Sequence, residues 1–219
     1  MVSFTLLAAI SLIPGAFTAP GQLLQRASTP SSEVQQATNY WQFWQEGGGN
    51  IKCNNGGGGS YTCTWSGGGF VAGKGYQPGG SRAVKYSGTY TPKGPGYLAL
   101  YGWTKNPLIE YYIVESYDIL APGEPWTRKG NFTFDEGTYE LYQSTRNNKP
   151  SIVGTATFQQ YWSVRTEKRV GGTITTGKHF DAWAKAGMKL GNHDYMIIAT
   201  EGFANGTKTP SGSCSITVE

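Results

Sequence analysis

From residue 39 onward, short stretches in which apolar and polar residues alternate follow one another, and turns rich in glycine separate them. Alternation with a period of two is typical of β-strands, because successive side chains of a strand point to opposite faces. The stretches NIKCNN (50–55) and SYTCTW (60–65) flank a turn of four glycines and predict a β-hairpin. The pattern therefore predicts a chain built mainly of twisted strands joined by tight turns.

The stretch YLALYGW (97–103) has two different faces. Its aromatic face carries Tyr97, Tyr101 and Trp103, while two leucines occupy the other face. The same alternation recurs in three further predicted strands, whose polar or aromatic faces carry Glu110, Tyr112, Gln160, Trp162, Tyr195 and Glu201. Aromatic rings stack on sugar rings, and phenol and amide groups bind hydroxyls, so these faces could line a carbohydrate cleft. Any one of the aromatics could instead fill a core, but a set on four strands favours the cleft.

Two glutamates interrupt strands that are otherwise apolar or aromatic. Glu110 lies in PLIEYYIVE (107–115) and Glu201 in DYMIIATEGF (194–203). A carboxylate in such a setting is costly to ionise, so it has either a raised pKa or a specific partner. An acid/base pair for sugar chemistry fits this pattern. A strand-end cap or a pairing with a nearby arginine fits it as well, and the strand pattern alone does not decide between these readings.

One stretch has a helical period. HFDAWAKAGMKL (179–190) places Phe180, Trp183, Ala184, Gly187 and Met188 at spacings of three and four residues. It predicts a helix whose Phe/Trp/Met face packs on the outside of a sheet. His179 is interpreted as a buried structural histidine, because no second metal ligand or nucleophile stands at a useful spacing.

Composition narrows the class of protein. The 219 residues fit one domain, and 32 glycines with 14% aromatics suit strands and turns better than helices. The net charge is +4, but no run of basic residues is longer than two. A nucleic-acid surface would cluster them, so nucleic acid is not expected as a partner. No phosphate loop, catalytic triad or metal-ligand spacing appears in the sequence.

The N-terminus indicates secretion to the extracellular space. Residues 1–19 have the short apolar core of a signal peptide, and residues 20–26 resemble a propeptide that ends at Arg26. No later stretch is long enough to cross a membrane. Secretion permits a disulfide, and Cys53 and Cys63 could face each other across the predicted hairpin. Alternatively, Cys214 pairs with one of them or all three remain free.

Ordered motifs along nearly the whole remaining chain carry a family resemblance. They include YWQFW (40–44), YLALYGW, NPLIEYYIVES (106–116), STRNNKPSIVGTATFQQYWSVR (144–165) and ATEGF (199–203). In these motifs the chain resembles the family 11 glycoside hydrolases, which are small secreted endo-β-1,4-xylanases of fungal type. The resemblance implies an all-β fold, a two-sheet jelly roll like a partly closed hand with one helix packed on the outside. It implies a single catalytic domain over 27–219, with its core at about 39–218.

The resemblance also implies roles for individual residues. Glu110 would be the nucleophile and Glu201 the general acid and then base of a retaining reaction, with the carboxyls roughly 5–5.5 Å apart. Trp44 would stack on a sugar, and PSIVG (150–154) would form the tip of a thumb loop over bound xylan. The candidate substrate-binding residues are Trp44, Tyr97, Tyr101, Trp103, Tyr112, Arg146, Pro150, Gln160, Trp162 and Tyr195. No metal or organic cofactor, no membrane and a monomer acting on xylan are expected.

One position departs from the family pattern. Just before Phe70 the family usually has an Asn or Asp that hydrogen-bonds the acid/base, whereas this shorter segment has Gly69. We expect hydrolysis to persist, with a pH profile that the usual Asn/Asp rule does not describe. A non-catalytic xylan-binding relative and a β-glucanase on a similar jelly roll are the alternative functions. Elicitation of plant defence is compatible with catalysis.

Overall fold

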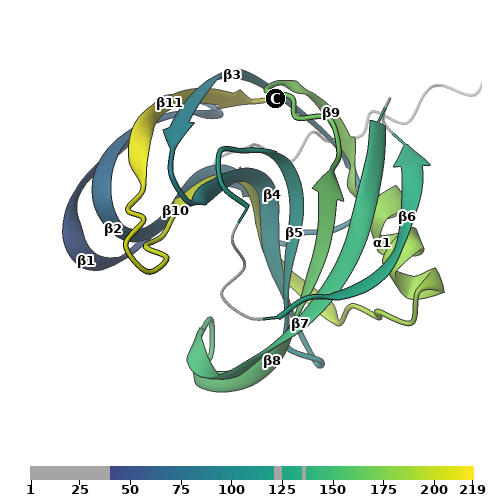
Figure 1. Ribbon diagram of the computed structural model, residues 1–219. Helices are drawn as coiled ribbons and strands as arrows, with labels where there is room; N and C mark the ends of the chain where they lie inside the picture. The colour runs from purple at the N-terminus through teal and green to yellow at the C-terminus, as the bar shows by residue number, and fades with distance from the viewer. Residues whose placement is uncertain (1–39, 121–124, 135–136) are drawn as a thin grey trace, which may run out of the picture. The chain divides into compact units, whose positions relative to one another are not determined.

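The computed structural model describes residues 40–120, 125–134 and 137–219 (Figure 1). The predicted signal peptide and propeptide lie outside the described residues. The strands, in chain order, are β1 (Tyr40–Asn55), β2 (Ser60–Tyr76), β3 (Ala83–Lys93), β4 (Gly96–Lys105), β5 (Ile109–Tyr117), β6 (Thr127–Phe134), β7 (Gly137–Ser151), β8 (Gly154–Arg165), β9 (Gly172–Thr175), β10 (Asn192–Gly202) and β11 (Ser211–Val218). One helix, α1 (Thr176–Lys185), follows β9 in this part of the chain.

The strands form a curled sheet in the order β6-β7-β8-β5-β4-β10-β2-β11-β3-β9, with β1 paired to β2 (Figure 1). β2 belongs to two layers, because residues 60–66 pair with β11 and residues 70–76 pair with β10. β11, β3 and β9 therefore form a smaller layer, and β10, β4, β5, β8, β7 and β6 a larger one. This is the two-sheet arrangement expected of a jelly roll.

Glycines allow β2 to pass from one layer to the other. Gly67 and Gly68 have φ of 74° and 72°, in the left-handed region that residues with a Cβ rarely adopt. Gly47 and Gly48 of the paired strand β1 also have positive φ, 88° and 75°. The register of β1 against β2 shifts between Gln45 and Gly47. The two strands thus bend together at a β-bulge.

Two apolar clusters lie on opposite faces of the larger layer. The first contains Tyr61 of β2, Tyr86 of β3 and Leu98 of β4, so it fills the space between the two layers. The second lies on the other face, called here the concave face, and consists of Val71, Tyr97, Ala99, Tyr101, Trp103, Tyr112, Val114, Phe158, Trp162, Val164, Tyr195, Ile197 and Ala199. The alternation predicted from the sequence is therefore confirmed.

The helix boundaries predicted from the sequence were wrong at both ends. α1 spans 176–185 rather than 179–190, and it ends because Gly187 adopts a φ of 80°. The amide of Gly187 donates to the Ala184 carbonyl (3.1 Å), and the amide of Met188 donates to the Trp183 carbonyl (2.8 Å). These two bonds form a Schellman motif, which closes a helix at a glycine.

The predicted buried face of the helix is partly confirmed. Trp183 and Met188 are fully buried in the first cluster, and Phe180 packs against it. Ala184 and Gly187 are exposed instead. The helix covers the face of the larger layer opposite to the concave face.

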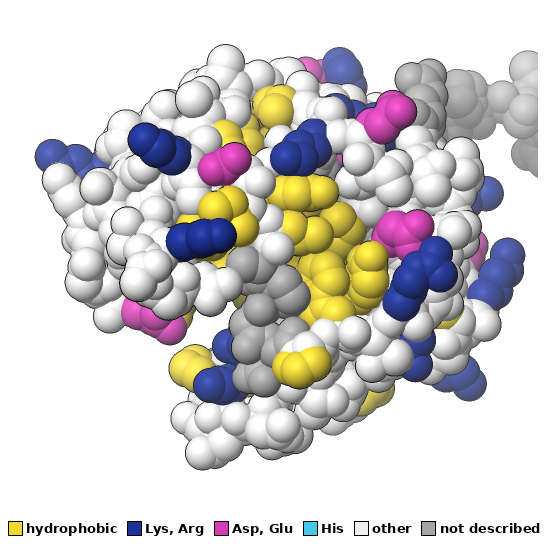
Figure 2. All heavy atoms as spheres, in the orientation of Figure 1, with side chains coloured by type: hydrophobic (Ala, Val, Ile, Leu, Met, Phe, Trp, Pro, Cys, Tyr) yellow, Lys and Arg dark blue, Asp and Glu magenta, His cyan; other side chains and the backbone are white. Residues whose placement is uncertain are grey.

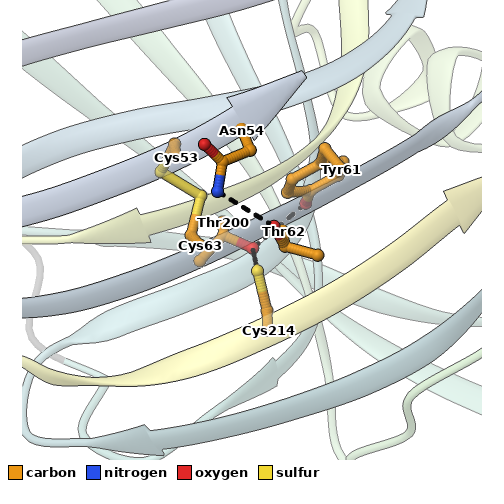
Figure 3. The surroundings of a disulfide bond; sticks show 7 residues. All are labelled: Cys53, Asn54, Tyr61, Thr62, Cys63, Thr200 and Cys214. Atoms are coloured by element: carbon orange, nitrogen blue, oxygen red, sulfur yellow. Dashed lines mark hydrogen bonds between the residues drawn. A yellow bond between two sulfur atoms is a disulfide. The ribbon is translucent and has the colours of Figure 1, made fainter. Parts of the chain in front are cut away.

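The cysteines lie in one row across three neighbouring strands (Figure 3). Cys53 and Cys63 face each other in the β1–β2 pair and form a disulfide, which decides among the three possibilities that the sequence left open. Cys214 of β11 faces Cys63 from the other edge of β2 and is a free, buried thiol. The hydroxyl of Thr200 donates a hydrogen bond to its sulfur (3.2 Å).

Candidate active site

Glu110 is a buried carboxylate that accepts hydrogen bonds from three neutral donors. It is 8% exposed and faces Gln160 in the parallel pair β5–β8. Its Oε1 accepts from the hydroxyls of Tyr101 (2.9 Å) and Tyr112 (3.1 Å), and its Oε2 from Gln160 Nε2 (2.6 Å). Burial raises the pKa of Glu110, while these bonds and the charge of Arg146 act against the rise. The three donors and Arg146 therefore favour the ionised form and offset part of the rise that burial causes in the pKa.

A second row of side chains orients these donors. Ser144 Oγ donates to Gln160 Oε1 (2.9 Å), so the amide nitrogen of Gln160 is the atom that faces Glu110. The indole of Trp162 donates in turn to Ser144 Oγ (3.3 Å). On the other side, the indole of Trp103 donates to the hydroxyl of Tyr101 (2.6 Å). The hydroxyl hydrogen of Tyr101 is thereby left for Glu110.

Glu201 lies on β10, where Val71 of β2 and Tyr97 of β4 flank it. It is half-buried. Burial, followed by the negative charge of Glu110, raises the pKa of Glu201 to about 8, although a hydrogen bond with Tyr112 and the charge of Arg146 oppose the rise. At neutral pH Glu201 therefore holds a proton.

Tyr112 connects the two glutamates. Its hydroxyl binds Glu110, and it also lowers the pKa of Glu201. Its ring stacks face to face on Trp162, with 4.0 Å between the ring centroids and 5° between the planes. A carboxyl group whose ionised form receives three hydrogen bonds, beside a second that holds a proton at neutral pH, can act as a nucleophile next to an acid.

Several other predicted site residues border the same face. Trp44 is 42% exposed and lies opposite Val71, so it shares a row with Glu201. Tyr195 is buried beside Tyr101, with ring centroids 6.1 Å apart. Arg146 lies on β7 opposite Phe158, and its charge acts on both glutamates.

The segment predicted as a thumb is the tip of the long β7–β8 hairpin. Pro150 is exposed and pairs with Thr155, and Val153 at the turn is 56% exposed. Figure 2 shows the surface hollowed between this tip and the strands at the other end of the sheet, with hydrophobic side chains gathered over the region of β4, β5 and β8. The hairpin thus extends beside the concave face (Figure 1).

Trp103 and Trp162 lie beneath the site rather than on an open surface. They are 2% and 3% exposed. Phe158 covers Trp103, and Tyr112 stacks on Trp162. Their indole groups orient the donors to Glu110, as described above.

Glu115 shares β5 with Glu110 but points to the other side. It is 1% exposed, accepts from Tyr139 (2.6 Å) and Tyr86 (3.3 Å) and pairs with Arg169. Among the described residues, no three His, Cys, Asp or Glu side chains are grouped as metal ligands would be. No helix in the described ranges is long and apolar enough to cross a membrane.

The family model of the glycosyl hydrolases family 11 matches residues 36–217 of this sequence. The chain belongs to glycosyl hydrolase family 11. The resemblance noted in the sequence is thereby confirmed.

Relatives of this family 11 chain carry xylanase names. "Ethylene-inducing xylanase 1" of Botryotinia fuckeliana is 51% identical over 198 residues, covering 90% of this chain and 69% of the relative. "Endo-1,4-beta-xylanase 1" of Pyricularia grisea is 46% identical over 235 residues, covering 100% and 99%. A solved structure from a comparison of two major endo-1,4-beta-xylanases of Trichoderma reesei matches with a TM-score of 0.76 and 40% identity, covering 84% of this chain and 99% of that one. The jelly-roll fold is thus confirmed.

Two residues of the site had no clear signal in the sequence. Ser144 lies in a polar stretch, and only the structure places its hydroxyl between Gln160 and Trp162. Glu46 precedes three glycines in the sequence and carries no motif of its own, yet it lies in β1 and its charge also raises the pKa of Glu201. A carboxylate within two residues of Trp44 could have suggested it.

Proposed function

We propose that this family 11 chain is an endo-1,4-β-xylanase that hydrolyses internal bonds of xylan with retention of configuration. The observation that carries the proposal is the contrast between the two carboxyl groups. Three donors and Arg146 favour the anion of Glu110, whereas burial and the charge of Glu110 hold the proton on Glu201. The xylanase names of relatives at 46–51% identity support xylan as the substrate.

The first step forms a covalent intermediate. Glu201 donates its proton to the glycosidic oxygen as the bond from this oxygen to the anomeric carbon breaks. A carboxylate oxygen of Glu110 attacks that carbon and forms an ester, and the shortened chain leaves as an alcohol. The hydrogen bonds that Glu110 receives must relax as its charge disappears, which keeps the ester reactive toward the second step.

The second step uses the same residues with the proton moving in the other direction. Because the ester carries no charge, the electrostatic cause that raised the pKa of Glu201 is removed, and Glu201 becomes a base. It takes a proton from a water molecule, whose oxygen attacks the anomeric carbon. The ester bond breaks and Glu110 is again a carboxylate. Two inversions give net retention.

The remaining residues bind the polymer. Trp44 offers an exposed aromatic face in the same cross-strand row as Glu201, where a xylose ring can stack. Arg146, Pro150 and the hairpin tip border the other side of the concave face. The buried Trp103 and Trp162 hold the tyrosines and Gln160 in place.

We also infer that the protein is secreted. The Cys53–Cys63 disulfide fits an oxidising compartment, and residues 1–19 have the sequence of a signal peptide.

Sugar release from xylan and from carboxymethylcellulose tests the activity. We expect reducing ends from xylan and few from carboxymethylcellulose, and Glu110→Gln and Glu201→Gln should each lose about three decades of rate or more. Activity on cellulose alone would favour a β-glucanase, and binding of xylan without cleavage would favour a non-catalytic relative.

An aryl xyloside separates the two roles. Its phenolate leaves without a proton, so Glu201→Gln should retain the first step on this substrate and Glu110→Gln should not. Equal loss in both variants would contradict the assignment.

A second candidate function, elicitation of plant defence, is favoured by relatives named as ethylene-inducing xylanases. Ethylene release by leaf tissue treated with Glu201→Gln would show elicitation that does not need hydrolysis. Ethylene release only with the active protein would show that elicitation depends on the sugars released by hydrolysis.

A further inference from the structure

Glu46 lies at the bulge where β1 bends with β2. Gln45 pairs with Phe70 and Gly47 pairs with Gly69, so Glu46 is the extra residue without a partner in the ladder. Such bulges often redirect a side chain next to an active site. Here the redirected side chain is a carboxylate on the strand that carries Trp44.

The carboxylate of Glu46 lies over Gly69. A β-carbon added at Gly69 would be 2.7 Å from Oε2 of Glu46 and 3.2 Å from its Cδ. The space that a side chain at position 69 would fill is therefore occupied by Glu46. A side chain at position 69 would therefore displace the Glu46 carboxylate, which is the flexible end of an exposed side chain.

Position 69 is on the same face as Glu201. Val71 belongs to the cluster on the concave face, and strand alternation places Gly69 on that face too. Val71 is the partner of Glu201 in β10, so Gly69 is a diagonal neighbour of Glu201. Diagonal neighbours lie about 7–8 Å apart, within reach of a long side chain.

We propose that Glu46 supplies from β1 the carboxylate that faces Glu201, in place of a side chain at position 69, and so sets the upper end of the pH range in which Glu201 keeps its proton. The inference rests on the proposed role of Glu201 as the acid. Glu46 acts through Glu201 and not on the substrate.

Other groups also shift the pKa of Glu201, and the charge of Glu46 adds to their effect. The titratable or charged residues that lie near Glu201 on neighbouring elements are Glu110 and Tyr112 of β5, Tyr97 and Tyr101 of β4, Arg146 of β7 and Glu46 of β1, together with Tyr90 of β3 from the other face of the sheet. Burial and Glu110 raise the pKa of Glu201 most, and Glu46 raises it further. Because Glu46 is exposed, its effect should be modest and sensitive to salt.

The test is a titration of the Glu201 carboxyl by ¹³C NMR, in protein labelled at the glutamate side-chain carboxyl carbon. The signal is assigned by its loss in Glu201→Gln. In Glu46→Gln we expect the midpoint of Glu201 to fall by about 0.2–0.7 pH units at low salt, the range for an exposed charge pair. In about 1 M salt the difference from the parent should shrink by half or more.

Glu167→Gln is the matched control, because it removes the charge of an exposed glutamate in the segment after β8. Its Glu201 midpoint should equal that of the parent. An unchanged or raised midpoint in Glu46→Gln, or an equal shift in Glu167→Gln, would overturn the proposal.

A substitution that moves the carboxylate without removing it gives a second test. Gly69→Ala should displace Glu46 and change the Glu201 midpoint in the parent, but not in the Glu46→Gln background. Equal changes in both backgrounds would contradict the proposal. Because the titration needs no substrate, it stands even if the protein fails to cleave xylan, whereas that failure would reject the proposed function.

Discussion

Gln160 and Glu110 face each other across the parallel pair β5–β8, and the amide of Gln160 donates a 2.6 Å hydrogen bond to the carboxylate. Loss of this donor in Gln160→Ala should raise the pKa of Glu110 further, because one bond to its ionised form is gone. We expect the acidic limb of kcat/KM to move up by about one pH unit or more, since a bond to a charged group contributes about 1.5–3 kcal/mol.

Gln159→Ala is the control for this experiment. Gln159 precedes Gln160 on β8 but bonds Gln143 and Thr145 and not Glu110. The acidic limb of the kcat/KM profile of Gln159→Ala should match that of the parent. An unchanged limb in Gln160→Ala would remove Gln160 from the control of Glu110.

Glu201 should make the protein less stable as pH rises. Its pKa increases on folding from an ordinary 4.5 to about 8, so the folded chain binds more protons than the unfolded chain between these values. The free energy of unfolding therefore falls across this window, and below it the effect disappears. Glu201→Gln should be more stable than the parent at pH 8, by about 1–3 kcal/mol, and nearly equal at pH 4. Denaturant melts at both pH values measure this, and a variant that is less stable at pH 8 would contradict it.

Glu115 should matter for stability and not for chemistry. It is buried on the face opposite to Glu110 and pairs with Arg169. Glu115→Gln leaves the arginine without its counter-charge, so we expect a loss of about 2–4 kcal/mol in the free energy of unfolding. The kcat on xylan at 25 °C should stay within about two-fold, because no group that contacts Glu110 changes. A loss of activity as large as that of Glu110→Gln would contradict this separation of the two faces.

Trp44 should contribute to binding and little to stability. Because it is 42% exposed, Trp44→Ala should change the free energy of unfolding by less than about 0.5 kcal/mol. A lost stacking contact of about 1 kcal/mol should raise KM for xylan roughly five-fold while kcat changes little. Phe43→Ala is the control, since Phe43 is exposed beside Trp44 but points to the opposite face of β1. Equal effects of the two substitutions would show that Trp44 has no specific role.

Strand faces could be predicted from the sequence because the period of two is a property of the backbone. Tyr97, Tyr101 and Tyr112 were placed on one surface by counting residues, and they lie there. The motif around Glu201 likewise located the second carboxyl group. Neither the strand alternation nor the motif predicts how far apart the two glutamates lie or which side chains donate hydrogen bonds to them.

Two of the features that the sequence missed depend on contacts between distant segments. α1 begins at Thr176, where the pairing of β9 with β3 ends and the hydroxyl of Thr176 contacts the carbonyls of Gly80 and Arg82, and no local period reveals these contacts. Its end depends on the conformation of Gly187. The place of Glu46 over Gly69 depends on a register shift between two strands, and hydrophobic alternation carries no information on such a shift.

The central claim is double displacement on xylan by Glu110 and Glu201. Proton NMR of the first products from a xylo-oligosaccharide tests it most directly, because it reports the anomer before mutarotation. We expect the β-anomer to appear first with the parent protein, and no product on the same timescale with Glu110→Gln. The α-anomer as first product, or β-anomer formation by Glu110→Gln at the parent rate, would contradict the claim.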